Sequence, residues 1–259
     1  MGALLQQWRR ARHLSQLALA TEAEVSSRHL CFIENGRASP SRDMVLLLSR
    51  VLDVPLRERN TLLLAAGFAP MYVESQLEAP ELESIRAALD AMLRQQEPFP
   101  AVVMNRHWDI VRTNQAATRF FGFLLGERAS SAPNNVLRMM FDPDAVRPFV
   151  ANWEAVAESL IQRVHRVSVG GVQDERTRAL LAALLDYPGV PRSWRKASLA
   201  TPLLPVAPIS FEKAGQRFDF FSTVTTIGTP QDITAQEIRV ECFFPANAAT
   251  DSAARRFSE

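Results

Sequence analysis

Cysteine is scarce in this sequence, and long apolar runs are missing. The two cysteines, Cys31 and Cys242, lie in no CxxC pair and at no Cys/His spacing typical of zinc ligands, which argues against a disulfide framework and a structural zinc site. The N-terminal residues lack the apolar core and the cleavage site of a secretory signal. No stretch reaches the roughly 18 uncharged apolar residues that span a bilayer. We therefore expect a cytoplasmic protein that does not enter a membrane.

The sequence also has no marked excess of positive or negative charge. The 259 residues include 29 Lys and Arg against 28 Asp and Glu, for a formal net charge of +1, so any nucleic-acid binding must depend on a local surface. The four histidines have no HExxH or paired-ligand spacing, and no GxSxG, P-loop or cofactor fingerprint occurs. We predict no catalytic residue, no metal site and no cofactor, and an enzyme is the weakest of the alternatives.

Five short helices are predicted between residues 3 and 66, because apolar residues recur there at helical spacing without strand-like alternation. Ser15 and Ser26 each precede a helical run and can cap it, and each is flanked by an apolar pair that fits a hydrophobic staple. Small alanines lie where the two capped helices must approach each other. Two capped helices separated by one tight turn are typical of a helix-turn-helix.

The segment SQLALATEAEVSSRHLCFIENGRASPSRDMVLLLSRVLDV, residues 15–54, closely resembles the Xre/Cro family of helix-turn-helix domains. The pieces that carry the resemblance are Gln16, Leu19-Ala20, Val25-Ser26, Ile33-Glu34-Asn35-Gly36-Arg37 and Pro40-Ser41. Glu24 departs from the family, which often has glycine at this position in the turn. The resemblance implies an all-α, five-helix domain that binds DNA.

By this resemblance, the helix from Ser27 to Glu34 enters the major groove of double-stranded DNA. Arg28 is predicted to grip guanine O6 and N7, and Phe32 to meet a thymine methyl group. Gln16 and Arg37 are predicted to hold phosphates and so to set the register. The complete set of predicted DNA contacts is Gln16, Ser26, Ser27, Arg28, His29, Phe32, Arg37 and Ser41. The alternative for each arginine is a solvated surface charge.

Two other residues near the motif are given structural roles. The family uses the pair Arg9 and Glu34 as a partly buried ion pair that ties the first helix to the third, and we expect the same here. Cys31 is interpreted as a packing residue without reactivity.

A domain junction is predicted at residues 67–80, where two prolines lie among loosely patterned polar residues. An amphipathic linker helix follows in PELESIRAALDAMLRQQE, and we expect it to pack on its own domain rather than on a second copy. The predicted division is 1–72 for the DNA-binding domain, 73–97 for the linker helix, 98–248 for the second domain and 249–259 for a flexible tail.

The second domain opens with two β-prone runs around a turn in AVVMNRHWDIVRTN, continues with mainly helical patterns, and closes with strands in RFDFFSTVTTIG and EIRVECFFP. The last run alternates, which predicts one packed face and one solvent-exposed face. Strands, then helices, then strands predict an antiparallel sheet with helices on one side, an α+β arrangement.

Short motifs follow one another in the second domain: Asp109-Ile110, Asn114 with Ala117, Asn152-Trp153-Glu154 with Arg163, Ser193-Trp194-Arg195, and a closing strand that ends at Pro245. In this order they resemble the MmyB-like transcription regulators, which join an Xre-type head to a PAS-like ligand-binding domain. The segment between Pro202 and Pro208 and the loop TPQDITAQE depart from the family pattern.

The resemblance implies a small apolar effector in the PAS-like domain, with a fatty acid as the best candidate. Aromatic side chains could line its cavity, and Arg163 could neutralise a carboxylate. The predicted ligand contacts are Trp108, Asn114, Phe120, Phe121, Trp153, Arg163, Trp194, Phe218 and Phe220. The alternatives are that the aromatics only fill the core, that Asn114 only caps a helix, and that Arg163 lies on an exposed helix face.

The resulting prediction is a sequence-specific transcriptional regulator whose partners are double-stranded DNA, a small apolar effector and a second copy of itself. The homodimer is inferred from how such heads usually bind a pseudo-palindromic operator. The junction and linker helix, residues 67–97, are the predicted two-state element. The alternative is a regulator that is constitutive or controlled by a protein partner, in which the second domain serves dimerisation.

Overall fold

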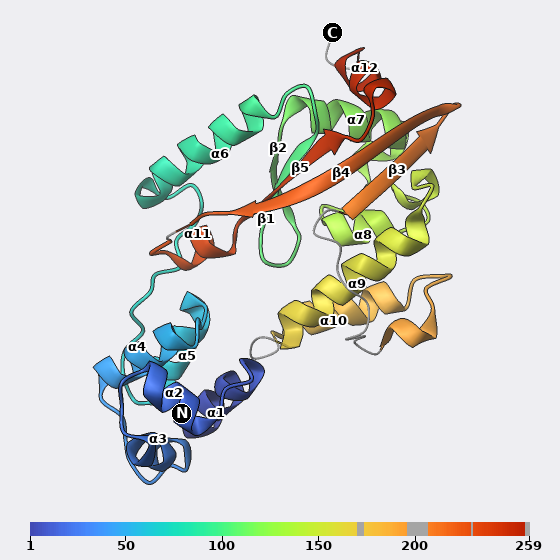
Figure 1. The fold of residues 1–259 in the computed structure, drawn as a ribbon. Coiled ribbons are helices and arrows are strands. Elements are labelled where there is room, and N and C mark those ends of the chain that lie inside the picture. Colours follow the sequence, from blue (N-terminus) through green and yellow to red (C-terminus); the bar gives the residue numbers. More distant parts are fainter. Residues whose placement is uncertain (170–173, 196–206, 229, 257–259) are drawn as a thin grey trace. The chain divides into compact units, whose positions relative to one another are not determined.

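The structure, a computed structural model, describes every residue except 170–173, 196–206, 229 and 257–259 (Figure 1). Its contacts divide the chain into two compact units. The first contains residues 1–76, 168–169 and 230–236, and the second contains most of the remaining chain from Leu77 onward.

The first unit is built on five helices, as the apolar spacing predicts. They are α1 (Gly2–Ala11), α2 (Gln16–Glu22), α3 (Ser27–Glu34), α4 (Arg42–Val51) and α5 (Leu56–Ala65). Their inward faces form one core, which includes Leu5, Trp8, Leu19, Ala20, Leu30, Ile33, Val45, Leu48 and Leu62. A side chain at Gly2 would place its Cβ 2.5 Å from the carbonyl oxygens of Ile33 and Glu34, so glycine allows α1 to begin directly against the end of α3.

The second unit contains a five-stranded antiparallel sheet in the order β2-β1-β5-β4-β3. The strands are β1 (Ala101–Met104), β2 (Ile110–Thr113), β3 (Ala207–Lys213), β4 (Gln216–Thr226) and β5 (Arg239–Pro245). The helices are α6 (Glu83–Gln95), α7 (Gln115–Leu125), α8 (Val136–Phe141), α9 (Trp153–Val169), α10 (Glu175–Leu185) and α12 (Ala248–Arg256). Short 3₁₀ turns are η1 (Pro80–Leu82), η2 (Gly126–Ser130), η3 (Arg147–Phe149) and η4 (Arg192–Arg195).

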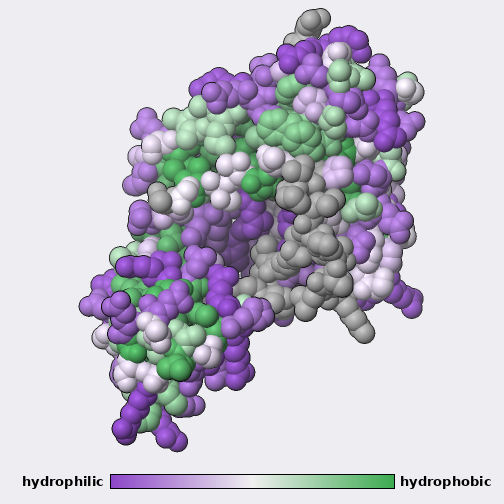
Figure 2. Space-filling view, in the orientation of Figure 1, coloured by the Kyte–Doolittle hydropathy of each residue, from purple (hydrophilic) through white to green (hydrophobic). Residues whose placement is uncertain are grey.

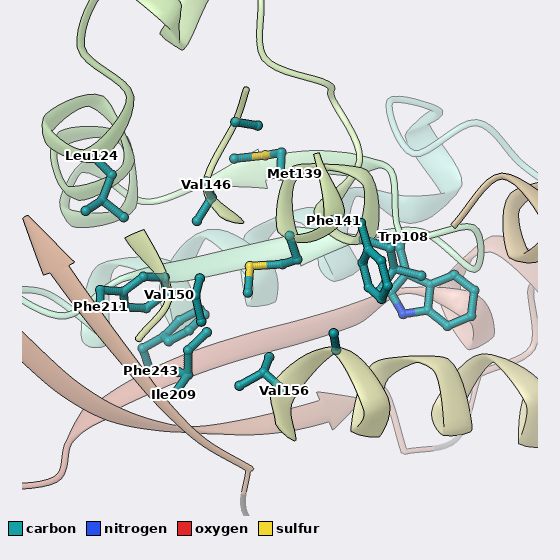
Figure 3. Packing of buried hydrophobic residues seen from close by; sticks show 14 of the residues in the cluster. Trp108, Leu124, Met139, Phe141, Val146, Val150, Val156, Ile209, Phe211 and Phe243 are labelled. Carbon is teal, nitrogen blue, oxygen red and sulfur yellow. The ribbon is translucent and has the colours of Figure 1, made fainter. Parts of the chain in front are cut away.

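One face of the sheet carries the main core of the second unit. Phe218 and Phe220 of β4, Phe243 of β5 and Met104 of β1 belong to this cluster with residues of α7, α8, α9 and α10. Figure 3 shows part of it, with Phe243 on the sheet, Leu124 of α7 and Val156 of α9. Neighbouring residues of a strand point to opposite faces, so Arg112, which pairs with Val103, lies on the other face. Arg112 forms an ion pair with Asp90 of α6, which places α6 on that second face. The expected α+β class is confirmed.

The expectation of a solvent-exposed face on the last strand is wrong. In β5 both Val240 and Cys242 on one face and Phe243 on the other are buried. β5 is the central strand of the sheet, between β1 and β4, and α6 contacts the neighbouring β1 from the face opposite the main core. A central strand covered on both faces cannot keep a wet side.

Two further elements were not anticipated from the sequence. β3 contains Pro208, which lacks a backbone N–H, and the strand tolerates it because β3 lies at the edge of the sheet. Where the sequence suggested a flexible tail from residue 249, the structure has α12, anchored by the buried residues Thr250 and Ala254. The Thr250 hydroxyl accepts a hydrogen bond from the backbone N–H of Asp219 in β4.

Candidate functional site

The turn between α2 and α3 has the geometry that its sequence predicts. Ser15 accepts a hydrogen bond from the N–H of Ala18, and Ser26 accepts one from the N–H of His29, so both serines cap as expected. Glu24 lies between the two helices with φ at 55°. This left-handed conformation favours glycine, which explains why the position stood out as a departure from the family. The turn keeps its shape with a non-glycine residue.

A buried ion pair joins α1 to α3, as the family resemblance implied. The Arg9 guanidinium donates from Nε and Nη2 to the two carboxylate oxygens of Glu34, at 2.7 and 2.8 Å. The Gln16 side-chain amide also donates to Glu34, at 2.7 Å. Burial by itself would raise the pKa of Glu34, but the hydrogen bonds from Arg9 and Gln16 outweigh burial, so the pKa lies below its ordinary value.

The outer surface of α3 carries the side chains predicted to meet bases. Ser27 and Arg28 are exposed and Phe32 is half-buried, and the Arg28 guanidinium lies 5.5 Å from the centre of the Phe32 ring. The stacking holds the two side chains together on the solvent side of the helix. The surface around α3, at the lower end of the head in this view, is mainly hydrophilic (Figure 2).

The remaining predicted DNA contacts fall into two groups. Ser26 and Ser41 are exposed at helix starts, where their hydroxyls cap α3 and α4, while Arg37 is exposed and His29 half-buried. Gln16 lies at the first position of α2 with its amide on Glu34. The structure therefore brings Arg28 and Phe32 into contact, and a hydrogen bond joins Gln16 to the buried Arg9–Glu34 ion pair.

The second unit contains a small apolar cavity between the sheet and the helices. Its volume is about 30 Å³, enough for one or two water molecules and far below the several hundred Å³ of a typical ligand site. Side chains near it meet from both layers, with Met139 and Val146 above and Phe211 and Phe243 on the strands (Figure 3). The lining consists of Val102, Ile110, Phe121, Val136, Met139, Met140, Val146, Phe211, Glu241 and Phe243.

The aromatic residues predicted to contact ligand form the core beside this cavity. Phe120 lies at the centre, with edge-to-face contacts to Phe121, Phe218 and Phe220 at 5.3 to 5.6 Å between ring centres. Phe121 lines the cavity, whereas Phe120, Phe218 and Phe220 are packed behind it. Phe211 extends the same cluster and was not anticipated.

The predicted tryptophans and Asn114 are not part of the cavity lining. The Trp153 indole N–H donates to the carbonyl of Met140, and its ring lies 6.3 Å from that of Trp194. Trp108 is buried in the turn after β1. Asn114 caps α7 as the alternative interpretation holds: its carbonyl oxygen accepts from the N–H groups of Ala101 and Ala117.

Arg163 is half-exposed on α9, and it forms no ion pair with another residue in the described part of the chain. Its charge lowers the pKa of Arg239 after the larger effect of burial, so the two guanidinium groups are neighbours. The Arg239 guanidinium lies over the Trp108 ring at 5.1 Å. The cavity lining does not include either arginine.

Most residues of the cavity lining were not predicted from the sequence. The prediction relied on aromatic residues and left out the short apolar run VLRMMF of α8. This run supplies Val136, Met139 and Met140. Adjacent methionines in a short apolar helix were the available signal, since methionine fills and adapts irregular spaces.

Two family models match separate parts of the chain. Residues 5–59 match the helix-turn-helix family, and residues 85–257 match the family described as the MmyB-like transcription regulator ligand binding domain. No curated protein matches the chain. In the part of the chain that the structure describes, every helix is too short or too polar to cross a bilayer.

Among solved structures, the chain is similar to one described as "Structure of an RNA-binding Light-Oxygen-Voltage Receptor", with 12% sequence identity and a TM-score of 0.27. The match covers 98% of this chain and 61% of that one, so this chain spans less than two thirds of its length. A likeness this weak carries no argument about function. The family matches over residues 5–59 and 85–257 do carry such an argument. Together they show that this chain belongs to the MmyB-like transcription regulators.

Proposed function

We propose that this regulator binds a specific DNA operator through an Xre-type head and that a small apolar ligand, with a fatty acid as the leading candidate, controls the binding. The observation that carries the proposal is the cavity, whose lining is apolar except for Glu241 and lies between the sheet and the helices of the ligand-binding domain. A protein that binds DNA must act in the compartment that holds the DNA, which we take to be the cytoplasm. We further propose that two copies bind a pseudo-palindromic operator.

The cavity must enlarge before a fatty acid can enter. The side chains that line it leave only about 30 Å³ free. Two of them belong to Met139 and Met140, whose unbranched, flexible side chains can adopt new rotamers. A ligand that binds only the enlarged form shifts the protein toward that form. A closed and an enlarged state of the second domain thus provide the two states that a sensor requires.

The ligand is tested by denaturing extraction of the purified protein, mass spectrometry of what it releases, and operator binding with and without dodecanoic acid. Val136→Phe adds bulk at the cavity lining and should abolish the effect of dodecanoic acid on DNA affinity. Val111→Phe makes the same change at an exposed position of β2 and should leave the effect intact. An empty domain whose DNA binding ignores apolar acids would favour the alternative, a constitutive or protein-partnered regulator.

The DNA contacts are tested by comparing two arginines on selected and scrambled DNA. Arg28→Ala should cost about 1 to 3 kcal/mol on the operator and relax the preference at one base position. Arg37→Ala should weaken binding to both DNAs similarly, because a phosphate contact carries no sequence information. Equal losses for the two variants on both DNAs would show that these roles are assigned wrongly.

A further inference from the structure

The connection between β4 and β5 contributes to the head. Residues 230–236 follow β4 and precede β5, yet they belong to the compact unit that contains α1 to α5. They include most of the short helix α11 (Ile233–Glu237). We call residues 232–236 the strap, because this segment is covalently continuous with two strands of the ligand-binding domain and packs within the head unit.

The strap caps a helix of the head. Leu56 is the first residue of α5, and its backbone N–H donates to Oε1 of Gln236 at 2.7 Å. The residue before it is Pro55, which provides no side-chain cap. The first N–H groups of a helix have no partner within the helix, so Gln236 does for α5 what Ser15, Ser26 and Ser41 do for the helices before it.

The strap also holds the segment that follows α5. The N–H of Ile233 donates to the carbonyl of Val73 at 2.9 Å, in a parallel bridge between Val73 and Asp232. Ser75 is held twice: its N–H donates to Asp232 Oδ2 at 3.0 Å, and its carbonyl accepts from the hydroxyl of Thr234 at 2.6 Å. Four hydrogen bonds, with that of Gln236, therefore join the strap to α5 and to the chain leaving it.

β5 connects this segment directly to the cavity. The strap ends at Gln236 and β5 begins at Arg239, while Glu241 and Phe243 of the same strand line the cavity. Strands are stiff, and every residue of β5 from Arg239 to Cys242 is paired with β1, so a displacement at Phe243 is carried along the strand rather than absorbed by it.

From this continuity, and resting on the function proposed above, we propose that the strap couples the cavity to the head. When the cavity is closed, the strap is docked and Gln236 caps α5. When the cavity enlarges around a ligand, β5 moves and Gln236 leaves Leu56. The start of α5 and the segment 73–75 then lose their hydrogen bonds to the strap, and the affinity of the head for DNA changes.

Amide hydrogen exchange of the full-length protein tests the docking without any ligand. Gln236→Ala should accelerate exchange at Leu56 by about fivefold, which is the loss of one helix cap. Gln231→Ala, an exposed glutamine just before the strap, is the matched control and should leave Leu56 unchanged. Equal exchange at Leu56 in the two variants would overturn the docking role of Gln236.

The coupling is tested in two ways that separate it from the ligand hypothesis. Val136→Phe fills the cavity without a ligand and should accelerate exchange at Leu56 and Ser75, whereas Val111→Phe should not; unchanged exchange in Val136→Phe overturns the coupling. Gln236→Ala should still bind dodecanoic acid by native mass spectrometry, but the acid should no longer change its affinity for selected operator DNA. A full response in that variant also overturns the coupling. Failure of the wild-type protein to bind any apolar acid would instead reject the proposed effector, and the Val136→Phe comparison would still decide the coupling.

Discussion

Glu34 keeps its charge inside the head because Arg9 and Gln16 both donate to its carboxylate. The Glu34 side chain has no exposed surface and that of Arg9 only 9%. A carboxylate in such a place depends on its partners, since a buried charge without them is expensive. These three residues come from α1, α2 and α3, so one side-chain cluster joins the helices of the DNA-binding motif.

Arg9→Met should destabilise the head by about 3 to 5 kcal/mol, because it leaves the Glu34 charge buried without its main partner. The double variant Arg9→Met/Glu34→Gln should recover part of this loss, since no charge then remains buried. Urea unfolding followed by helix circular dichroism measures both. A double variant that loses as much as the two single changes combined would contradict the ion pair as the cause.

The same carboxylate predicts how the stability of the head depends on pH. The pKa of Glu34 is lower in the folded head than the ordinary value of about 4.3, which it has when unfolded. The stabilisation is therefore complete above the unfolded pKa and is lost as the pH falls through the folded pKa. Unfolding free energies between pH 7 and pH 3 should show a fall below about pH 4.3 that is absent in Glu34→Gln.

At the scale of elements, the helices of the second unit are held to the sheet by specific polar contacts as well as by the apolar core. α12 contacts β4 through Thr250, which is 1% exposed and accepts from the N–H of Asp219. α7 is capped by Asn114, which also accepts from Ala101 at the start of β1. Each contact fixes the end of a helix to a particular position along a strand.

Thr250→Val should cost about 1 to 3 kcal/mol, because valine has the same shape but leaves the N–H of Asp219 without its acceptor. Ser252, exposed two residues farther along α12, supplies the control Ser252→Val, which should change stability by less than about 0.5 kcal/mol. Thermal or urea unfolding compares the two variants. A neutral Thr250→Val would mean that α12 contributes nothing through this contact.

For the whole molecule, DNA binding must depend on a local surface, because the net charge of the chain is only +1. Residues 1–72 carry nine arginines and six acidic residues, so the positive excess lies in the head. Each phosphate contact releases condensed counterions from DNA, which makes affinity depend on salt. The salt dependence of binding therefore reports on the head.

Arg37→Ala should reduce the slope of log affinity against log salt concentration by about 0.9, the value for one lost phosphate contact. Arg94→Ala removes an exposed arginine of the second unit and should leave the slope unchanged. Fluorescence anisotropy with a labelled operator at several salt concentrations measures both slopes. An equal change in the two variants would show that DNA contacts extend beyond the head.

The sequence alone was sufficient to predict the helices of the head, because the signals that define them are local. Ser15 and Ser26 lie next to the helices they cap, and the apolar spacing of residues 3–66 defines one face of each helix. Family resemblance supplied one long-range contact there, the ion pair between Arg9 and Glu34. The α+β class of the second unit followed from the order of strand-like and helix-like runs.

Only the tertiary structure decided which surfaces face each other. Alternation along β5 defines two faces but not what covers them. The face of Glu241 and Phe243, expected to be solvent-exposed, lies against the main core and its cavity, while α6 covers the opposite face beside β1. The cavity combines residues from α7, α8 and four strands, and the strap meets α5 across 180 residues of sequence. Such contacts depend on the packing of distant segments, which no local spacing encodes.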